Sequence, residues 1–192
     1  PAVDLFRVKD YGDPLDARAA DLHYRCYNFQ AWFDAAIGLT GLLLRDADLV
    51  EHAIDGPYGF KHLLAHDIHD DGVFWERSIG YQNFVLAALY PLLEGCYHCN
   101  LDLWHLSVPD DYNTDREPLT NYCVGDGDHG PKSIKLLFDS QFYLGYGDLT
   151  RAQIADSDRG PLAASDVFRT AWVRYGDPRL AWLINRTRQK AR

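Results

Sequence analysis

The segment YNFQAWFDAAIGLTGLLLRD, residues 27–46, constrains the fold more than any other part of the chain. Its apolar residues recur at the three- and four-residue spacing of an α-helix with one buried face. They are Phe29, Trp32, Phe33, Ala36, Ile37, Leu43 and Leu44. Two amides, Asn28 and Gln30, stand at the front of this segment, and N-capping alone would explain an Asn there. The pattern predicts a long helix that buries its large apolar side chains.

Helical spacing recurs along the rest of the chain, whereas no alternation of useful length predicts a strand. We expect helices over 47–54, around 60–64, along the apolar face from Tyr81 to Leu93, and over 132–144, 163–175 and 178–188. The predicted class is all-α, with helices and uneven loops arranged as an (α/α) toroid-like array. Residues 1–16 are expected to form an irregular lead-in, and residues 17–192 a single helical domain.

Composition narrows the classes of function. With 47% hydrophobic and 24% charged residues, the chain can bury a core, and its net charge of −9 disfavours nucleic acid as a partner. No run of 18 apolar residues predicts a membrane span, and no signal peptide is visible. The CxxC pair of Cys96 and Cys99 lacks the second ligand pair of a structural zinc site. We therefore expect buried thiols, or a disulfide if the protein is exported, among Cys26, Cys96, Cys99 and Cys123.

Three groups of residues are candidates for chemistry, and each also has a structural explanation. Asn28 with Gln30 could simply begin a helix. Tyr81, in WERSIGYQNF, lies on an apolar helical face and could be a core tyrosine. The third group is in IADSDRG, where Asp156, Asp158 and Arg159 could form a solvated turn with a local ion pair.

Taken in order, three motifs resemble the heparinase II/III and alginate lyase superfamily of polysaccharide lyases. They are Asn-x-Gln-x-Trp in the first segment, Trp-Glu-x-Ser-x-x-Tyr before the second long helix, and Asp-Ser-Asp-Arg-Gly later in the chain, and the resemblance spans about residues 25–185. It implies an (α/α) helical toroid followed by a β-sandwich. It also implies β-elimination next to a uronic acid, in which an amide or imidazole neutralises the substrate carboxylate and a tyrosine serves as base or acid.

Carried onto this chain, the resemblance makes Asn28 and Tyr81 the catalytic candidates. The substrate-binding candidates are Gln30, Trp32, Glu76, Arg77, Asp156, Asp158 and Arg159, with no cofactor and no metal expected. The chain has Phe29 and Gln82 where many relatives have histidine. A histidine base would then come from elsewhere, with His66, His69, His105 and His129 as the candidates.

The expected partner is an anionic polysaccharide or oligosaccharide, without nucleic acid or membrane. Because the resemblance implies further domains, we expect an incomplete toroid that a second copy or a missing C-terminal part completes, and the activity of the isolated chain stays open. The expected location is periplasmic or secreted, with the cytoplasm as the alternative. Two other functions stay open: a toroid glycoside hydrolase pairing Glu76 with Asp156 or Asp158, and a carbohydrate-binding or scaffold fragment using Trp32, Trp75 and Trp104.

Overall fold

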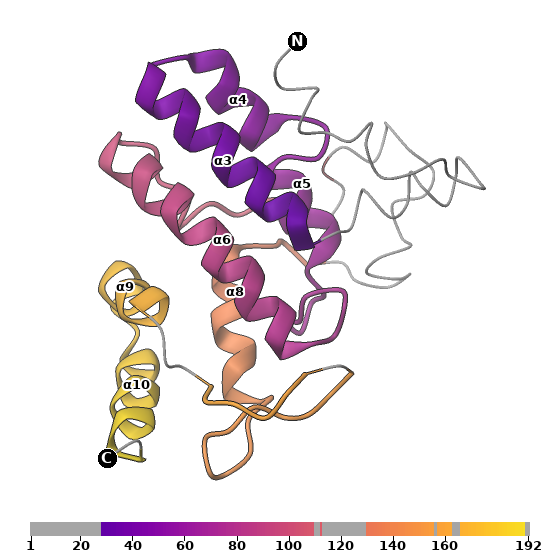
Figure 1. The fold of residues 1–192 in the computed structure, drawn as a ribbon, viewed down its shortest axis with the longest axis vertical. Coiled ribbons are helices and arrows are strands. Elements are labelled where there is room, and N and C mark those ends of the chain that lie inside the picture. The colour runs from indigo at the N-terminus through magenta and orange to yellow at the C-terminus, as the bar shows by residue number, and fades with distance from the viewer. Residues whose placement is uncertain (1–27, 110–111, 113–129, 156, 163–165, 191–192) are drawn as a thin grey trace, which may run out of the picture.

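The computed structural model describes residues 28–109, 112, 130–155, 157–162 and 166–190 (Figure 1). Regular structure in this part of the chain is helical, and β pairing is confined to isolated bridges. The elements are α3 (Asn28–Leu44), α4 (Ala47–Asp55), α5 (Phe60–Asp67), α6 (Ile79–His98), α8 (Ile134–Asp139), the 3₁₀ turn η2 (Ser140–Phe142), α9 (Asp166–Tyr175) and α10 (Pro178–Lys190). The all-α prediction is confirmed. The toroid arrangement stays a prediction, and the predicted boundary at residues 16 and 17 lies outside the described residues.

Helix α3 buries a different face from the one that its large apolar residues predict. Its buried side includes Ala31, Ala35, Gly38 and Gly41, whereas Leu43 and Leu44 are exposed. The small residues are buried because neighbouring helices approach closely. A Cβ on Gly38 would lie 2.5 Å from Cδ1 of Leu92, and one on Gly41 would lie 2.8 Å from Cγ2 of Val50. The helix prediction was therefore right, but of the large residues predicted to be buried, Ile37 is buried while Phe29, Trp32, Leu43 and Leu44 are exposed.

Helices α3 and α6 lie side by side and run in the same direction (Figure 1). Near their beginnings, the ring centroids of Phe29 and Phe84 are 5.4 Å apart. Further along, Gly38 faces Leu92, and a Cβ on Gly95 would lie 3.1 Å from Cδ1 of Leu42. Contact positions thus rise together along both helices. This parallel packing brings the beginning of α3, with Asn28, and the beginning of α6, with Tyr81, to the same end of the helix pair.

A short hairpin connects α5 to α6 and sets the direction in which α6 begins. Ile68 and Phe74 form an antiparallel bridge, and the His69 amide donates to the Val73 carbonyl at 2.9 Å. The chain turns tightly at Asp71-Gly72, with Gly72 at φ 79°, a conformation that glycine adopts at low cost. The hairpin returns the chain toward α3 immediately before Glu76.

Of the three helices predicted in the last part of the chain, one is shorter than predicted and two lie close to their predicted ranges. The helix predicted over 132–144 is only α8 plus the single 3₁₀ turn η2. Lys132 cannot join it because its backbone pairs with Val108, with N–O distances of 2.7 and 2.8 Å. Helices α9 and α10 are close to their predicted ranges. Leu180, Leu183 and Ile184 bury one face of α10 in the core.

A charged cluster connects α6 to α9. Arg174 donates from Nε and Nη2 to the two carboxylate oxygens of Glu94, at 2.9 and 2.6 Å. The fully buried Trp104 donates its indole N–H to the same carboxylate at 3.0 Å. The hydrogen bond from Arg174 lowers the pKa of Glu94 below its ordinary value, against the opposing effect of burial. Glu94 therefore stabilises the packing of two helices and a core tryptophan.

We expect Glu94→Ala to lower the free energy of unfolding by about 2 kcal/mol, because it leaves Trp104 and Arg174 without their shared acceptor. Chemical denaturation at neutral pH measures this loss. The matched control is Glu51→Ala at an exposed position of α4. Since the pKa of Glu94 is lowered in the folded state, the difference from wild type should shrink as pH falls below the ordinary pKa of glutamate. An equal loss in both variants would contradict this role.

Two further predictions concern thiols and membranes. Cys96 is buried and Cys99 is exposed, both as free thiols, while Cys26 and Cys123 lie outside the described residues. Burial raises the pKa of Cys96 to about 11, so its thiol stays protonated at neutral pH.

Among the described residues, no helix has the length and apolar character needed to cross a membrane.

Candidate active site

The amide of Asn28 and the carboxylate of Glu76 form the centre of the candidate site. The Nδ2 atom of Asn28 lies 2.9 Å from Oε1 and 3.1 Å from Oε2 of Glu76. Asn28 is buried, and its Oδ1 has no hydrogen-bond partner among the described residues. The structure therefore brings together the first two sequence motifs, which are 48 residues apart. The amide nitrogen carries two hydrogens and already faces an anion.

Two buried aspartates lie behind this pair, and sequence reasoning missed both. Gln30 donates from Nε2 to Oδ1 of Asp34 at 2.8 Å, so its amide is turned into the protein interior. Asp67, at the end of α5, is almost completely buried, and neither carboxylate oxygen has a hydrogen-bond partner in the described part of the chain. Burial first, and then the charges of Asp34 and Glu76, raise the pKa of Asp67 well above its ordinary value. The charged form of Asp67 is therefore strongly disfavoured in the folded protein.

Replacing Asp67 with asparagine should make the protein more tolerant of alkaline pH. Because the pKa of Asp67 is raised in the folded state, the wild-type chain binds more protons folded than unfolded above pH ~4. Its free energy of unfolding should then fall with rising pH, by up to about 1.4 kcal/mol per unit, until the folded-state pKa is reached. Asp67→Asn removes this slope, as denaturation series across pH will measure. Parallel pH profiles for the variant and the wild type would contradict the assignment.

Exposed aromatic side chains border the candidate site. Phe29, Trp32 and Tyr81 are 39%, 40% and 38% exposed, and the Phe84 ring packs against both Phe29 and Trp32. We call these four residues the aromatic face. Phe29 and Trp32 are one turn apart on α3, as are Tyr81 and Phe84 on α6, so the parallel helices place them at one end. Such a surface can stack on the apolar face of a sugar ring.

The third sequence motif packs against the beginning of α6. The hydroxyls of Ser78, the N-cap of α6, and Ser157 are 2.9 Å apart, and the Gly80 amide donates to Ser157 at 3.3 Å. Asp156 lies outside the described residues. Asp158 is exposed and pairs with Arg151 at 3.2 Å, while Arg159 pairs with Asp148 at 2.9 Å. The motif therefore positions a loop beside Tyr81, and Ser157 makes the contact.

Arg151 is the cation that the structure brings to this loop, and no motif pointed to it. Its guanidinium covers Gly160, so a larger residue there would have to displace the guanidinium. Its Nη1 lies 3.9 Å from where a Cβ would stand on Gly80, the residue before Tyr81. Arg77, a predicted substrate-binding residue, is exposed at a φ of 56°. Only the loop fold, not the sequence order, could have identified Arg151.

The candidate histidines contact other groups, are buried, or lie outside the described residues. Nε2 of His66 is 2.7 Å from the Tyr112 carbonyl, and burial lowers the pKa of His66 below its ordinary value. His105 is exposed, with Nδ1 2.7 Å from the Asp102 carboxylate. His69 is buried, and His129 lies outside the described residues. No group of three or more metal-ligating side chains occurs in the part of the chain that the structure describes.

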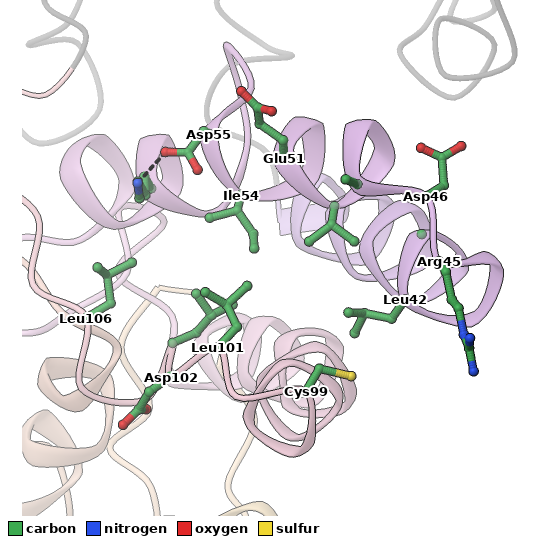
Figure 2. Close-up of a pocket in the computed structure, with 15 residues that line it drawn as sticks. Leu42, Arg45, Asp46, Glu51, Ile54, Asp55, Cys99, Leu101, Asp102 and Leu106 are labelled. Carbon is green, nitrogen blue, oxygen red and sulfur yellow. Dashed lines mark hydrogen bonds and ion pairs between the residues drawn. The ribbon is translucent and has the colours of Figure 1, made fainter.

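A cavity of about 520 Å³ lies elsewhere, between the ends of α3 and α6 and helix α4 (Figure 2). Its lining includes Leu42, Ile54 and Leu101, with Asp55 and Lys61 paired at its edge. Leu42 is 14 residues along α3 from Asn28, which corresponds to about 20 Å of helix. This apolar cavity is therefore separate from the candidate site.

Comparison with known proteins gives one match. The sequence profile of the alginate lyase family matches residues 8–116, a range that contains Asn28, Glu76 and Tyr81. No curated protein and no solved structure matches the chain. The profile covers more than half of the 192 residues and includes both helices that form the candidate site. The chain belongs to the alginate lyase family.

Proposed function

We propose that the chain is a polysaccharide lyase that cleaves a uronate-containing polysaccharide by β-elimination, with Asn28 as carboxylate neutraliser and Tyr81 as base and acid. The observation that carries the proposal is the meeting of Asn28, Glu76 and the beginning of α6 at one end of two parallel helices. Family membership supports the class of reaction. The aromatic face supports a sugar ligand. The wider link to heparinase II/III enzymes is part of the proposal.

The chemistry requires a neutral donor at the substrate carboxylate. The C5 proton of a uronate is a poor acid while its carboxylate is ionised, so hydrogen bonds that grow stronger as charge develops on that carboxylate accelerate proton removal. In our proposal one N–H of Asn28 stays bound to Glu76, which fixes the plane of the amide. The second N–H binds the substrate carboxylate. Glu76 is then a positioning residue, and Gln30 acts through Asp34 and does not touch the substrate.

Proton transfer is assigned to Tyr81. A tyrosine has an ordinary pKa of about 10, so a phenolate that acts as base needs a nearby cation or hydrogen-bond donors. We assign this role to Arg151, whose Nη1 approaches the residue before Tyr81. The base takes the C5 proton, the C4–O bond breaks, and the departing oxygen receives a proton. The products are a new reducing end and an unsaturated uronate.

The hydrolase alternative has less support. It needs an accessible acid and an accessible carboxylate on opposite sides of a glycosidic bond. Asp67 has a raised pKa, but at 1% exposure its carboxyl group does not reach the surface. Glu76 is bound to Asn28, and Asp158 is 83% exposed and paired with Arg151. A non-catalytic sugar-binding role would use the same aromatic face, and assays of bond cleavage distinguish it.

The proposed activity is tested by incubating the chain with polymannuronate, polyguluronate, hyaluronan, heparan sulfate and ulvan. The unsaturated product absorbs in the ultraviolet, and we expect this absorbance to grow with at least one polymer. Circular dichroism checks that the chain is folded in the same buffer. A folded chain that binds a uronan without forming the chromophore would overturn the proposal and favour a binding role. We further propose that the protein acts outside the cytoplasm, where such polymers occur.

A further inference from the structure

A second cleft lies between α10 and the loop that follows η2. Its volume is about 330 Å³, within the range of small-molecule sites. The loop contributes Gly147, Asp148 and Leu149, and α10 contributes Trp182, Arg186 and Gln189. The three α10 residues follow one another at spacings of four and three, so they share one face of the helix. The opposite face of α10 is buried through Leu183 and Ile184.

The side chains of this cleft suit an acidic sugar. Trp182 is 51% exposed and offers an indole face for stacking on a pyranose ring. Arg186 is exposed, and a guanidinium binds a carboxylate through two parallel hydrogen bonds. Gln189 and Asp148 provide an amide and acceptor oxygens for sugar hydroxyls. Asp148 is already paired with Arg159 at 2.9 Å, so these two charges offset each other. Arg186 then gives the cleft a positive charge, although the chain as a whole has a net charge of −9.

The cleft is connected to the candidate active site by a single loop. Asp148 and Arg159 pair at its α10 side, and Thr150 donates to the Asp148 carboxylate at 2.5 Å. At its other side Ser157 contacts Ser78 and Gly80, next to Tyr81. In Figure 1 this orange segment runs along the bottom of the molecule from below the beginning of α6 toward α10. The same loop therefore contacts the beginning of α6 and lines the cleft.

We propose that the cleft formed by Trp182, Arg186, Gln189 and Asp148 is a remote binding subsite for a uronate unit of an anionic oligosaccharide. That this ligand is also the substrate rests on the proposed lyase function. The subsite lies away from the bond that breaks. It should therefore raise the affinity for long chains without changing the chemical step. Short oligouronates that occupy only the site at Asn28 and Tyr81 cannot use it.

Binding without turnover tests this subsite. In a Tyr81→Phe background, which prevents consumption of the ligand, calorimetry measures the affinity for hexamers and dimers of mannuronate and guluronate. We expect Trp182→Ala and Arg186→Gln each to raise the hexamer Kd by about tenfold, a loss typical of one stacking or charged contact. The dimer Kd should not change. Matched controls are Trp172→Ala and Arg188→Gln, which alter exposed residues outside the cleft.

Three results would overturn the subsite. They are equal hexamer affinities in the cleft variants and their controls, an equal loss for dimers and hexamers, and equal binding of a neutral hexasaccharide. Failure of the lyase function gives a different result: hexamer binding still depends on Trp182, while the chain with Tyr81 intact forms no unsaturated product. Failure of the subsite alone leaves product formation in place and makes it independent of Trp182. Circular dichroism of all variants excludes unfolding as the cause.

Discussion

Tyr81→Phe should lower kcat for β-elimination by a factor of about 10³ or more, because general acid–base catalysis by one side chain contributes ~10²–10⁴ and this residue is assigned both proton transfers. Phenylalanine retains the ring in the aromatic face and removes only the hydroxyl. Affinity for oligouronates and the free energy of unfolding should therefore stay close to wild type. The measurement is the initial rate of ultraviolet absorbance at saturating polymer.

Tyr97→Phe is the matched control for this prediction. Tyr97 is on the same helix with the same exposure of 38%, but at the opposite end, and its ring still accepts the Arg174 guanidinium after the change. We expect full activity in this variant. A Tyr81→Phe protein that keeps kcat within a few-fold of wild type would contradict the assignment. The base would then have to come from another group near the beginning of α6.

Asn28→Asp should lower kcat/KM by about 10²–10³, the range seen when one preorganised donor to a developing charge is removed. The change keeps the size of the side chain and replaces its N–H donors with a carboxylate. It also places a second negative charge about 3 Å from Glu76 in a buried position. We therefore expect lower stability as well as lower activity.

The double variant Asn28→Asp with Glu76→Gln separates these two effects. The glutamine amide can donate to the new aspartate, so stability should return toward wild type. Activity should not return, because the donor to the substrate carboxylate is still absent. Recovery of activity together with stability would mean that Asn28 has only a structural role. Denaturation curves and polymer assays on the same preparations supply both readouts.

Local signals mark the beginnings of two helices that helical periodicity predicted. Asp46 accepts hydrogen bonds from the Asp48 and Leu49 amides and begins α4, and Ser78 caps α6. These caps act within a few residues, so they can be recognised without knowing the rest of the fold. The resemblance grouped residues of the first two motifs in one candidate site. Asn28 and Glu76 form a direct hydrogen bond, although the pattern alone could not tell which atoms would meet.

The features that could not be predicted from the sequence depend on contacts with distant parts of the chain. The buried face of α3 is set by how closely α4 and α6 approach Gly41 and Gly38, and no helical period contains that information. Asp67 has polar neighbours in the sequence, yet it ends α5 inside the core. Arg151 reaches Gly80 from a loop in which its backbone N–H donates to the Gly160 carbonyl, a contact between residues nine apart. Periodicity predicts an element, whereas tertiary packing decides which face is buried.

The fate of the glycosidic oxygen tests the central claim most directly. Polymer is cleaved in water enriched in heavy oxygen, and the fragments are weighed by mass spectrometry. β-Elimination breaks the C4–O bond and adds no water. We therefore predict fragments with an unsaturated uronate at the new non-reducing end and no heavy oxygen gained by cleavage. Saturated fragments that are heavier by one water and carry heavy oxygen at the new reducing end would contradict the account and identify a hydrolase.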